Sequence, residues 1–394
     1  MARIRVLVVD DSVVVRRLVT DALSGAPDIE VVGSAANGRI ALTKVDQLAP
    51  DVVTMDIEMP EMDGIEAVRA LRAAGRRLPI IMFSTLTERG AVATLDALGA
   101  GASDYVTKPA NVGSVQESLA RVADQLLPKI RALVPVPGLT VTQGRGRPDL
   151  GAAATPGART APVPTTPVTT REEPAGRVVR AVVIGSSTGG PEALSRVLTG
   201  LAAPLPVPVL VVQHMPPLFT RQLAARLDRQ GPSTVVEVVG GEELVPGTVY
   251  VAPGDFHLEV RRSARGASTV LTQTPPVNFC RPSVDVMFRS AERAFGGDLL
   301  AVVLTGMGSD GRAGCADIVE AGGTVVVQDE ATSVVWGMPG AVATAGLAHR
   351  VLPLDRVAAT VTDIVRASTS PPPGMRAPVP TGVRPISTGG SRWP

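Results

Sequence analysis

The stretch AVVIGSSTGG, residues 181–190, decides the fold of the second half of the chain. Four apolar residues lead directly into a polar, glycine-rich corner. A buried strand that turns sharply into a helix has this pattern in parallel sheets. The corner suits a phosphate-binding loop, a turn that exposes a nucleophilic serine, or a plain tight turn. The residues at the ends of the other predicted strands distinguish these interpretations.

The rest of the chain predicts two α/β domains. Short apolar runs alternate with helical patterns over residues 3–125 and again over about 178–367. This alternation is typical of doubly wound parallel sheets, so we predict a flavodoxin-like first domain and a Rossmann-like second domain. The expected strands are 4–10, 29–35, 51–57, 79–85 and 103–109 in the first domain, and 177–185, 207–214, 248–254, 299–306 and 323–329 in the second.

Composition sets the predicted domain boundaries. Pro, Gly, Ala, Thr and Arg dominate the segment from about 135 to 176, and Pro and Gly are frequent in the last stretch. Such segments lack the apolar residues that a packed core needs. We predict a first domain over 1–128, a disordered linker over 129–177, a second domain over 178–367 and a disordered tail over 368–394.

The overall composition argues against several functional classes. The 38 basic and 37 acidic residues nearly cancel, so no global basic field favours binding of nucleic acid. We find no apolar stretch near 20 residues and no leader, and therefore expect a cytoplasmic protein without membrane insertion. The two cysteines, Cys280 and Cys315, lack the spacing of a metal site.

Polar residues end four strands of the first predicted sheet. Asp10 and Asp11 follow the first strand, Asp56 ends the third, and Ser84 and Lys108 end the fourth and fifth. The carboxyl ends of parallel strands meet at one edge, where three carboxylates repel one another unless a cation lies between them. Their hard oxygens suit Mg²⁺. A lysine and a serine at the same edge favour phosphoryl transfer to Asp56; merely solvated strand ends are the alternative.

This set of residues resembles the response-regulator receiver domain over residues 3–125. The resemblance implies that a sensor histidine kinase donates a phosphoryl group to Asp56. It also implies that Asp11, Asp56 and the backbone carbonyl of Glu58 hold Mg²⁺, with Asp10 assisting through water.

The same resemblance assigns the residues that respond to phosphorylation. It implies a switch hydroxyl at Ser84, a switch aromatic side chain at Tyr105 and an ammonium at Lys108 that pairs with the phosphoryl oxygens. It further implies a cis peptide bond between Lys108 and Pro109, which proline makes energetically accessible.

Three strand ends of the second predicted domain carry the residue types of a serine hydrolase. Ser187 is the centre of a Gly-x-Ser-x-Gly pattern, His214 follows the next strand, and Asp310 lies in the loop GMGSDG. A serine hydroxyl needs a base, and the base needs a partner that fixes its tautomer. The glycines permit a sharp turn and leave backbone N–H groups available for an oxyanion. The chain order Ser, His, Asp disfavours the α/β-hydrolase family.

Each of these residues has an alternative role. Ser187 is also suited to cap a helix, and Asp310 is suited to an Asx turn. Ser186 is the rival nucleophile, although it is not at the centre of the glycine pattern. His257 is the rival base, although it lies within a predicted strand.

The nucleotide-binding interpretation fails on spacing. A dinucleotide-binding loop requires G-x-G-x-x-G and an acidic residue at the end of the next strand. Here the glycines stand at 185, 189 and 190, and the next strand ends in Gln213 and His214. The chain also lacks a Gly-Lys-Ser/Thr sequence for a P-loop.

A second resemblance is carried by IGSSTGGPEAL, VVQHMPPLFTRQLAARL, VYVAPGDFHLEV, RPSVDVMF and LTGMGSDG. Together these segments resemble the chemotaxis protein-glutamate methylesterase family over about 178–367, and a preceding receiver completes that family's architecture. The resemblance implies Ser187 as nucleophile, His214 as general base and Asp310 as its orienter. It places the oxyanion hole at backbone N–H groups near Thr188 and Met307.

The resemblance also implies the activity. Glutamate methyl esters on chemoreceptor helices would be hydrolysed with release of methanol, receptor glutamines would be deamidated, and phosphorylation would activate both reactions. No cofactor is implied for the esterase step. A phosphorelay-controlled binding module with a degenerate hydrolase site is the alternative. A receiver-linked transcription factor is disfavoured, because the second domain lacks a helix-turn-helix pattern and a basic face.

The sequence departs from the methylesterase family pattern at three places. It has GSST where the family usually has GAST, and Ser309 where an Asn commonly precedes the aspartate. It also has Cys280 where a His usually precedes RPSVD. The first two changes spare the predicted triad, and the third affects the predicted substrate loop.

Overall fold

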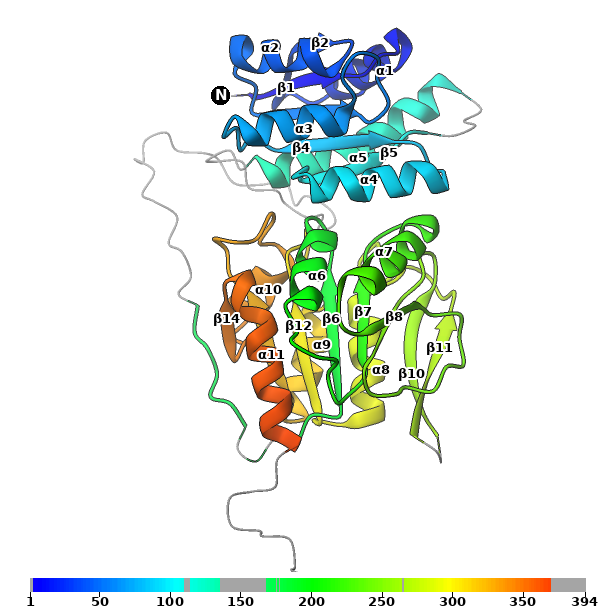
Figure 1. Ribbon diagram of the computed structural model, residues 1–394, viewed down its shortest axis with the longest axis vertical. Coiled ribbons are helices and arrows are strands. Elements are labelled where there is room, and N and C mark those ends of the chain that lie inside the picture. The colour runs from blue at the N-terminus through cyan, green and yellow to red at the C-terminus, as the bar shows by residue number, and fades with distance from the viewer. Residues whose placement is uncertain are drawn as a thin grey trace, which may run out of the picture.

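The computed structural model shows two α/β domains, one stacked on the other (Figure 1). It describes residues 3–109, 114–134, 168–174, 176, 178–263 and 266–369. Most of the predicted linker at 129–177 and nearly all of the predicted tail at 368–394 lie outside these residues. None of the described helices is long and apolar enough to cross a membrane.

The first sheet has five parallel strands in the order β2-β1-β3-β4-β5. This is the flavodoxin-like order, which confirms the predicted fold class. The strands are β1 (Ile4–Val9), β2 (Ile29–Ala35), β3 (Val52–Asp56), β4 (Ile80–Ser84) and β5 (Asp104–Thr107). The helices are α1 (Val13–Ser24), α2 (Gly38–Leu48), α3 (Gly64–Ala73), α4 (Glu88–Gly99) and α5 (Val115–Leu133).

Helices cover both faces of this first sheet. Ala41 of α2, Val68 of α3 and Leu95 of α4 pack into one apolar cluster, and Leu23 of α1 and Leu126 of α5 pack into the other. Strands β3 and β4 are therefore buried along their whole length, which explains their mostly apolar sequence.

Helix α5 continues to Leu133, past the predicted domain boundary at residue 128. Two contacts hold this last part of the helix. Ile130 is buried in the core, and the Arg131 guanidinium forms two hydrogen bonds of 2.8 Å with the carboxylate of Asp28.

The second sheet has seven parallel strands in the order β14-β13-β12-β6-β7-β9-β8. Its strands are β6 (Ala181–Ser186), β7 (Val209–Gln213), β8 (Thr234–Glu237), β9 (Thr248–Val251), β12 (Leu299–Val303), β13 (Thr324–Gln328) and β14 (Arg350–Leu352). Its helices are α6 (Gly190–Thr199), α7 (Pro217–Gln230), α8 (Val284–Phe295), α9 (Arg312–Glu320), α10 (Met338–Thr344) and α11 (Leu354–Thr369). The doubly wound parallel fold is confirmed here too.

This sheet is also covered on both faces. Helices α6, α7 and α11 bury Leu194, Phe219 and Val361 on one face, while α8 and α9 bury Phe288 and Ile318 on the other. An antiparallel hairpin of β10 (His257–Ser263) and β11 (Gly266–Thr272) packs against α8. The sequence did not predict β8, β11 and β14, which are short or only partly buried.

The two domains contact each other through α4 of the first and α6 and α7 of the second (Figure 1). Tyr105 stacks on Phe219 with ring centroids 4.8 Å apart and planes 9° from parallel. At the rim, Arg226 donates a hydrogen bond of 2.8 Å to Asp96. A single apolar cluster runs through both domains, so their junction is packed like a core.

Candidate active site and phosphorylation site

The polar ends of β6, β7 and β12 meet at one edge of the second sheet. The chain runs from β6 outward to β7 and later returns to β12 on the other side of β6. A crevice opens at such a reversal of strand order. The register pairs Gly185 with Val303 and Ser186 with Gln213, so the loops after these strands start side by side.

Ser187 occupies the sharp turn between β6 and α6. Its backbone N–H donates to the carbonyl of Thr305 (3.0 Å), and its carbonyl accepts from Nε2 of Gln213 (2.9 Å). Gly189 begins α6 with φ at 76°, a left-handed conformation that favours glycine. Gly306 allows the loop after β12 to approach, because a Cβ there would lie 2.9 Å from the Cβ of Ser187.

The neighbouring Ser186 has a structural role. Its side chain is fully buried, and its hydroxyl donates to Oε1 of Gln213 at 2.7 Å. A substrate carbonyl has no access to this hydroxyl. Ser187 is half-buried, and its hydroxyl makes no hydrogen bond within the described part of the chain. Of the two serines, Ser187 is the one with an available hydroxyl.

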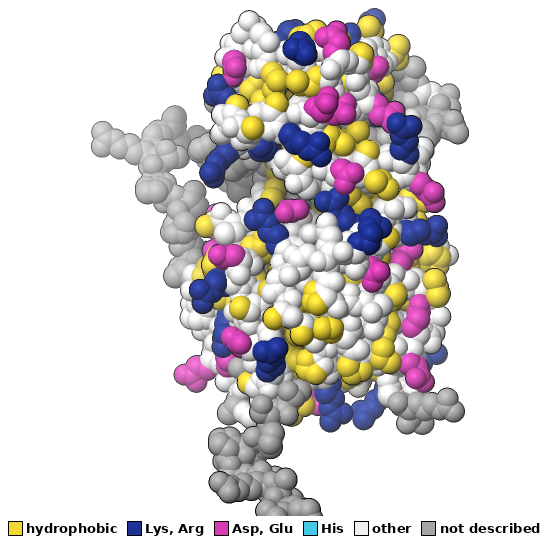
Figure 2. All heavy atoms as spheres, viewed as in Figure 1, with side chains coloured by type: hydrophobic (Ala, Val, Ile, Leu, Met, Phe, Trp, Pro, Cys, Tyr) yellow, Lys and Arg dark blue, Asp and Glu magenta, His cyan; other side chains and the backbone are white. Residues whose placement is uncertain are grey.

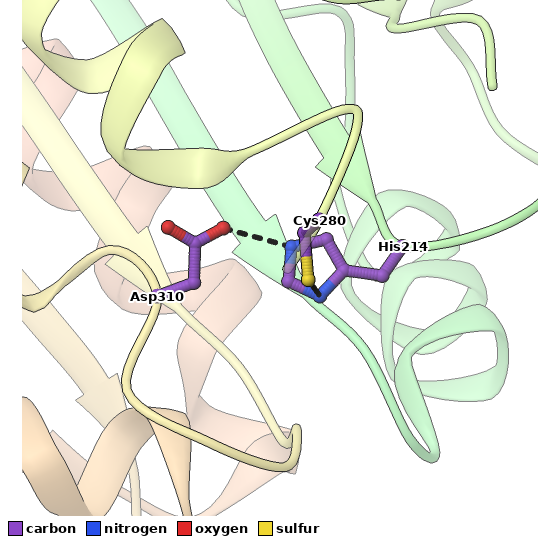
Figure 3. Close-up of side chains that lie close together, drawn as sticks. All are labelled: His214, Cys280 and Asp310. Carbon is purple, nitrogen blue, oxygen red and sulfur yellow. Dashed lines mark hydrogen bonds and ion pairs between the residues drawn. The ribbon is translucent and has the colours of Figure 1, made fainter. Parts of the chain in front are cut away.

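His214 and Asp310 form a buried acid–base pair. Nε2 of His214 lies 2.9 Å from Oδ2 of Asp310, and the two side chains are 12% and 3% exposed (Figure 3). Ser187 and His214 line one cavity of about 20 Å³ at the junction of the two domains. The structure thus brings His214 and Asp310 into contact and places Ser187 beside the same cavity.

The carboxylate of Asp310 is held by donors on all sides. Oδ2 accepts from the backbone N–H of Val284 at 2.7 Å in addition to His214. Oδ1 accepts from the Asn278 amide (2.9 Å), the Ser283 hydroxyl (2.9 Å) and the backbone N–H groups of Asp285 (3.1 Å) and Gly311 (3.1 Å). Two of these N–H groups begin α8, where the helix dipole also stabilises negative charge.

This surrounding shifts two pKa values in opposite directions. Burial disfavours the ionised carboxylate of Asp310, but the hydrogen bonds from His214, Asn278 and Val284 outweigh it and lower its pKa to about 2. Burial disfavours the imidazolium of His214, but the bonds to Asp310 and Cys280 outweigh it and raise its pKa to about 10. Both shifts have the same origin, because the contact between the two side chains favours the carboxylate of Asp310 and the imidazolium of His214.

The rival base His257 has a different position. It is fully buried at the start of β10, where Nδ1 accepts from the backbone N–H of Ser283 (3.2 Å) and Nε2 lies 3.3 Å from the carbonyl of Pro275. Both ring nitrogens are thus used to anchor the segment before α8. His257 fixes a loop and does not face the crevice serine.

The predicted oxyanion donors Thr188 and Met307 come from the loops after β6 and β12. Within the described residues, neither the backbone N–H of Thr188 nor that of Met307 makes a hydrogen bond. The Thr188 side chain is buried, and its hydroxyl donates to Oδ2 of Asp104 in the first domain at 2.7 Å. The roles of Thr188 and Met307 in catalysis stay predictions.

Sequence reasoning missed the segment that supports the acid. Asn278 and Ser283 come from the loop between β11 and α8, yet both donate to Asp310. A serine followed by an apolar, helix-periodic run predicts a helix start at Ser283. Its hydroxyl caps no helix and binds Asp310 instead, which the local sequence does not reveal.

At the edge of the first sheet, Lys108 bridges two buried carboxylates. Its Nζ lies 2.9 Å from Oδ2 of Asp10 and 2.9 Å from Oδ1 of Asp56. Burial raises the pKa of Asp56, Lys108 partly offsets this, and the charge of Asp10 adds to it, giving a value of about 6. Burial lowers the pKa of Lys108, but its two carboxylate partners outweigh burial and raise it.

The donor set of this edge fits a hard divalent cation. Carboxylate oxygens of Asp10, Asp11 and Asp56 lie within 4.8 Å of one another, and Asp11 is exposed to solvent. Oxygen donors of this kind suit Mg²⁺. Glu58 is exposed, with its carboxylate 3.6 Å from Arg89, and the role of its carbonyl stays a prediction.

The two predicted switch residues, Ser84 and Tyr105, contact groups other than Asp56. The Thr94 hydroxyl of α4 donates to that of Ser84 at 2.7 Å, and Ser84 lies 3.2 Å from the carbonyl of Gly90. Tyr105 is buried against Phe219 of the second domain, and burial raises the pKa of its phenol.

The expected cis bond between Lys108 and Pro109 is not present. Among the described residues, the cis peptide bond joins Arg281 and Pro282. The prediction for Lys108–Pro109 was wrong, and the bond keeps the trans form that X–Pro bonds favour by roughly 0.5–1 kcal/mol.

Comparisons with known proteins identify relatives along nearly the whole chain. The model of the CheB methylesterase family matches residues 182–361, and that of the response regulator receiver domain matches residues 6–120. A protein-glutamate methylesterase/protein-glutamine glutaminase of Nocardioides sp. is 65% identical over 354 residues, covering 90% of this chain and 93% of that protein. Protein-glutamate methylesterase/protein-glutamine glutaminase 2 of Caulobacter vibrioides is 49% identical over 358 residues, covering 90% and 96%.

Solved structures resemble each domain separately. The Thermotoga maritima CheB methylesterase catalytic domain is 43% identical with a TM-score of 0.47, covering 48% of this chain and 99% of that chain. The response regulator domain of Thermotoga maritima CheB is 46% identical with a TM-score of 0.30, covering 33% and 94%.

Proposed function

The chain belongs to the CheB methylesterase family, and on that premise we propose that it hydrolyses glutamate methyl esters on the cytoplasmic helices of chemoreceptors. It releases methanol, deamidates receptor glutamines at the same site, and is activated by phosphorylation of its first domain. The observation that carries this proposal is the buried His214–Asp310 pair at the crevice lined by Ser187. A substrate on cytoplasmic receptor helices places the reaction in the cytoplasm.

The hydrolysis proceeds in two halves. His214 takes the proton of the Ser187 hydroxyl as its oxygen attacks the ester carbonyl, and Asp310 holds the imidazole and stabilises the imidazolium. The N–H groups of Thr188 and Met307 receive the oxyanion. His214 returns the proton to the departing methanol, and then activates the water that hydrolyses the acyl-enzyme. With a glutamine, ammonia leaves in place of methanol.

Asp56 is the proposed phosphate acceptor. A sensor histidine kinase supplies the phosphoryl group, and Lys108, already between Asp10 and Asp56, pairs with its oxygens. Asp11, Asp56 and the carbonyl of Glu58 would hold Mg²⁺, with Asp10 assisting through water, and the ion would neutralise the charge of the transferring phosphoryl group.

Docking of the first domain explains why phosphorylation is needed. The cavity beside Ser187 measures about 20 Å³, room for about one water molecule and too small for a methyl glutamate side chain. The Asp104 carboxylate closes it from the first domain, held by Thr188 on one side and by Lys129 at 2.7 Å on the other. Receptor and first domain therefore compete for one edge.

The proposed route from phosphate to interface runs through α4. In the docked form Ser84 accepts a hydrogen bond from Thr94 of α4, the helix that contacts α6 and α7. A phosphoryl group on Asp56 attracts the Ser84 hydroxyl and weakens that bond. The docking equilibrium then shifts by the difference in docking free energy between the two states, typically a few kcal/mol.

The nucleophile is tested with adjacent serines. Ser187→Ala is expected to abolish both methanol release from methylated receptor and the acyl-enzyme. Ser186→Ala is the matched control, because it removes a buried hydroxyl that only binds Gln213. Retention of most turnover by the Ser187 variant would refute the assignment.

Inhibition by docking is tested by removing the first domain. A fragment beginning at residue 168 keeps every element of the second sheet and is expected to show higher basal methanol release than the full chain. A small phosphodonor should raise the activity of the full chain and leave the fragment unchanged. Equal basal rates for the two would contradict inhibitory docking.

Two other functions have less support. A binding module with a degenerate hydrolase site does not explain why His214 and Asp310 remain in hydrogen-bond contact. A nucleic-acid partner does not match the surface, since basic and acidic side chains are interspersed on the face in Figure 2.

A further inference from the structure

A cysteine contacts the imidazole of His214 and lies close to Asp310. Sγ of Cys280 is 3.5 Å from Nδ1 of His214, within hydrogen-bond distance for sulfur, and Figure 3 shows this contact together with that of Asp310 with Nε2. A carboxylate oxygen of Asp310, a ring nitrogen of His214 and Sγ of Cys280 all lie within 4.8 Å of one another. A thiol beside a histidine that a carboxylate holds has the residue types of enzymes that use a cysteine nucleophile.

The hydrogen bonds of Asp310 determine which nitrogen faces the thiol. Its carboxylate is ionised and accepts from Nε2 of His214, so the proton of a neutral imidazole resides on Nε2. Nδ1 is left as the acceptor, and Cys280 is the group next to it. The imidazole nitrogen that must take the Ser187 proton is therefore already in contact with another acid.

Cys280 can be reached from solvent while the domains are docked. It is partly exposed in an open groove of about 490 Å³. All residues that line the groove belong to the second domain, among them His214, Met215, Pro217, Phe279 and Arg281. A small reagent therefore meets the thiol without displacing the first domain.

The charged groups around the thiol come from three neighbouring segments. Arg281 pairs with Asp255 of the loop before β10 at 2.5 Å, and the hydrogen-bond partner of the Cys280 thiol is Nδ1 of His214. A carboxylate oxygen of Asp310 lies within 4.8 Å of Sγ, and Asp285 of α8 is held by Asn278 and the backbone N–H of Gly314.

We propose that Cys280 is a reactive thiol whose covalent modification by hydrogen peroxide or another small electrophile switches the catalytic histidine off. His214 takes the thiol proton, and the thiolate attacks one peroxide oxygen. The S–O bond forms as the O–O bond breaks, sulfur loses two electrons, and the leaving hydroxide takes the proton from His214 to become water. The product is a sulfenic acid, which a thiol reductant returns to the thiol.

Modification of Cys280 affects catalysis because Nδ1 of His214 both contacts the thiol and must accept the Ser187 proton. An oxidised or alkylated sulfur stays next to Nδ1, places a bulky group there and blocks proton transfer from Ser187. This effect on esterase turnover rests on the proposed function. The reactivity of the thiol rests on geometry alone, so the two are tested separately.

The first experiment measures thiol reactivity on the full chain. Iodoacetamide is added at pH 7 and labelling is followed by peptide mass spectrometry. Cys280 is expected to react roughly tenfold faster than N-acetylcysteine, because Nδ1 of His214 is in place to accept the thiol proton as the sulfur attacks. Cys315 is the internal control: it is buried in α9, burial raises the pKa of its thiol, and it should react only in urea.

The variant His214→Gln assigns that reactivity to the imidazole. It should slow labelling of Cys280 roughly tenfold while Cys315 stays protected, which also shows that the fold is intact. A Cys280 rate equal to that of N-acetylcysteine, or unchanged in the variant, would overturn the proposal. Neither readout depends on esterase activity.

The second experiment measures the switch. Methylated receptor is supplied to the full chain and to Cys280→Ala after peroxide treatment, and each activity is expressed as a fraction of the same protein untreated. Peroxide should lower the methanol release of the unsubstituted chain at least about tenfold, and dithiothreitol should restore it. The Cys280→Ala variant should keep most of its untreated activity. Equal losses in both proteins would show oxidation elsewhere and refute the switch. Absence of methanol release from all untreated samples would instead refute the proposed function.

Discussion

Each of the two domains buries an aspartate at the reversal point of a parallel sheet, and each aspartate contacts a cationic partner. Asp310 meets His214, and Asp56 meets Lys108, both at 2.9 Å. Their pKa values nevertheless move in opposite directions, to about 2 for Asp310 and about 6 for Asp56. Burial opposes ionisation at both positions, so burial cannot explain the difference.

The difference comes from the neutral donors and the neighbouring charge. Asp310 accepts from three backbone N–H groups and two side chains besides His214. Asp56 accepts from one backbone N–H, that of Ile57, and shares its lysine with a second carboxylate, Asp10. A carboxylate with many hydrogen-bond donors, such as Asp310, serves as a fixed support. A carboxylate with few donors, such as Asp56, keeps the reactivity that the proposed phosphate acceptor needs.

The largest expected effect tests the supporting role. Asp310→Asn should lower the turnover number for methanol release by about 10⁴, because an amide no longer fixes the tautomer or balances the imidazolium. Asp317→Asn, which affects an exposed ion pair with Arg289, is the matched control. A loss below tenfold would show that Asp310 only builds the loop.

The second prediction concerns Asp56, the carboxylate with few hydrogen-bond donors. A folded-state pKa of about 6 for Asp56 exceeds the value of an unfolded chain, so the folded protein binds more protons between about pH 4 and 6. Stability then falls as pH rises through this window, and Asp56→Asn should stabilise the first domain at pH 7 by roughly 2–3 kcal/mol. Hydrogen exchange of β1 and β3 in metal-free buffer measures this. If Asp56→Asn does not stabilise the first domain relative to the unsubstituted chain, the inferred difference between Asp56 and Asp310 is wrong.

A third test concerns the cationic partner of Asp310. Cys280 raises the pKa of His214, and a base works only when deprotonated. Cys280→Ala should therefore move the acid limb of the esterase pH profile toward lower pH. Cys280→Ser restores a weak hydrogen bond and should shift the limb less. An acid limb at the same pH in all three proteins would contradict this coupling.

The smallest effect concerns the contact between the two domains. Arg226 and Asp96 form an ion pair at the rim of the interface, and such exposed pairs contribute about 0.2–1 kcal/mol. Arg226→Ala should raise basal methanol release by no more than about fivefold, in proportion to the weakened docking. Arg229→Ala on the same helix is the control. A decrease in basal activity would contradict the inhibitory role of docking.

Much of both sites could be predicted because strand ends determine position. Asp10, Asp56 and Lys108 follow strands of one parallel sheet, so topology alone brings them together. The same reasoning placed Asp310 near His214, although 96 residues separate them. The sharp turn at Ser187 was predictable from its glycines.

The rest of the two sites depends on long-range contacts that leave no pattern in the local sequence. Asn278 and Ser283 reach Asp310 from a loop whose path is fixed by packing of the β10–β11 hairpin on α8. The Thr188–Asp104 bond joins two domains, and each residue suits its own strand or turn without it. The contact of Cys280 with His214 likewise follows from the loop's folded path.

The hydrogen bond from Thr188 to Asp104 has a consequence for how the proposed enzyme senses its surroundings. Thr188 adjoins Ser187, the proposed nucleophile, so a receptor helix that binds there must displace the first domain. Thermodynamic linkage makes this influence mutual: crowded, heavily methylated receptors favour the phosphorylated state by the same factor by which phosphorylation favours receptor binding. The esterase activity of such a molecule depends on both the amount of methylated receptor and the extent of phosphorylation. It rises most steeply when both increase together.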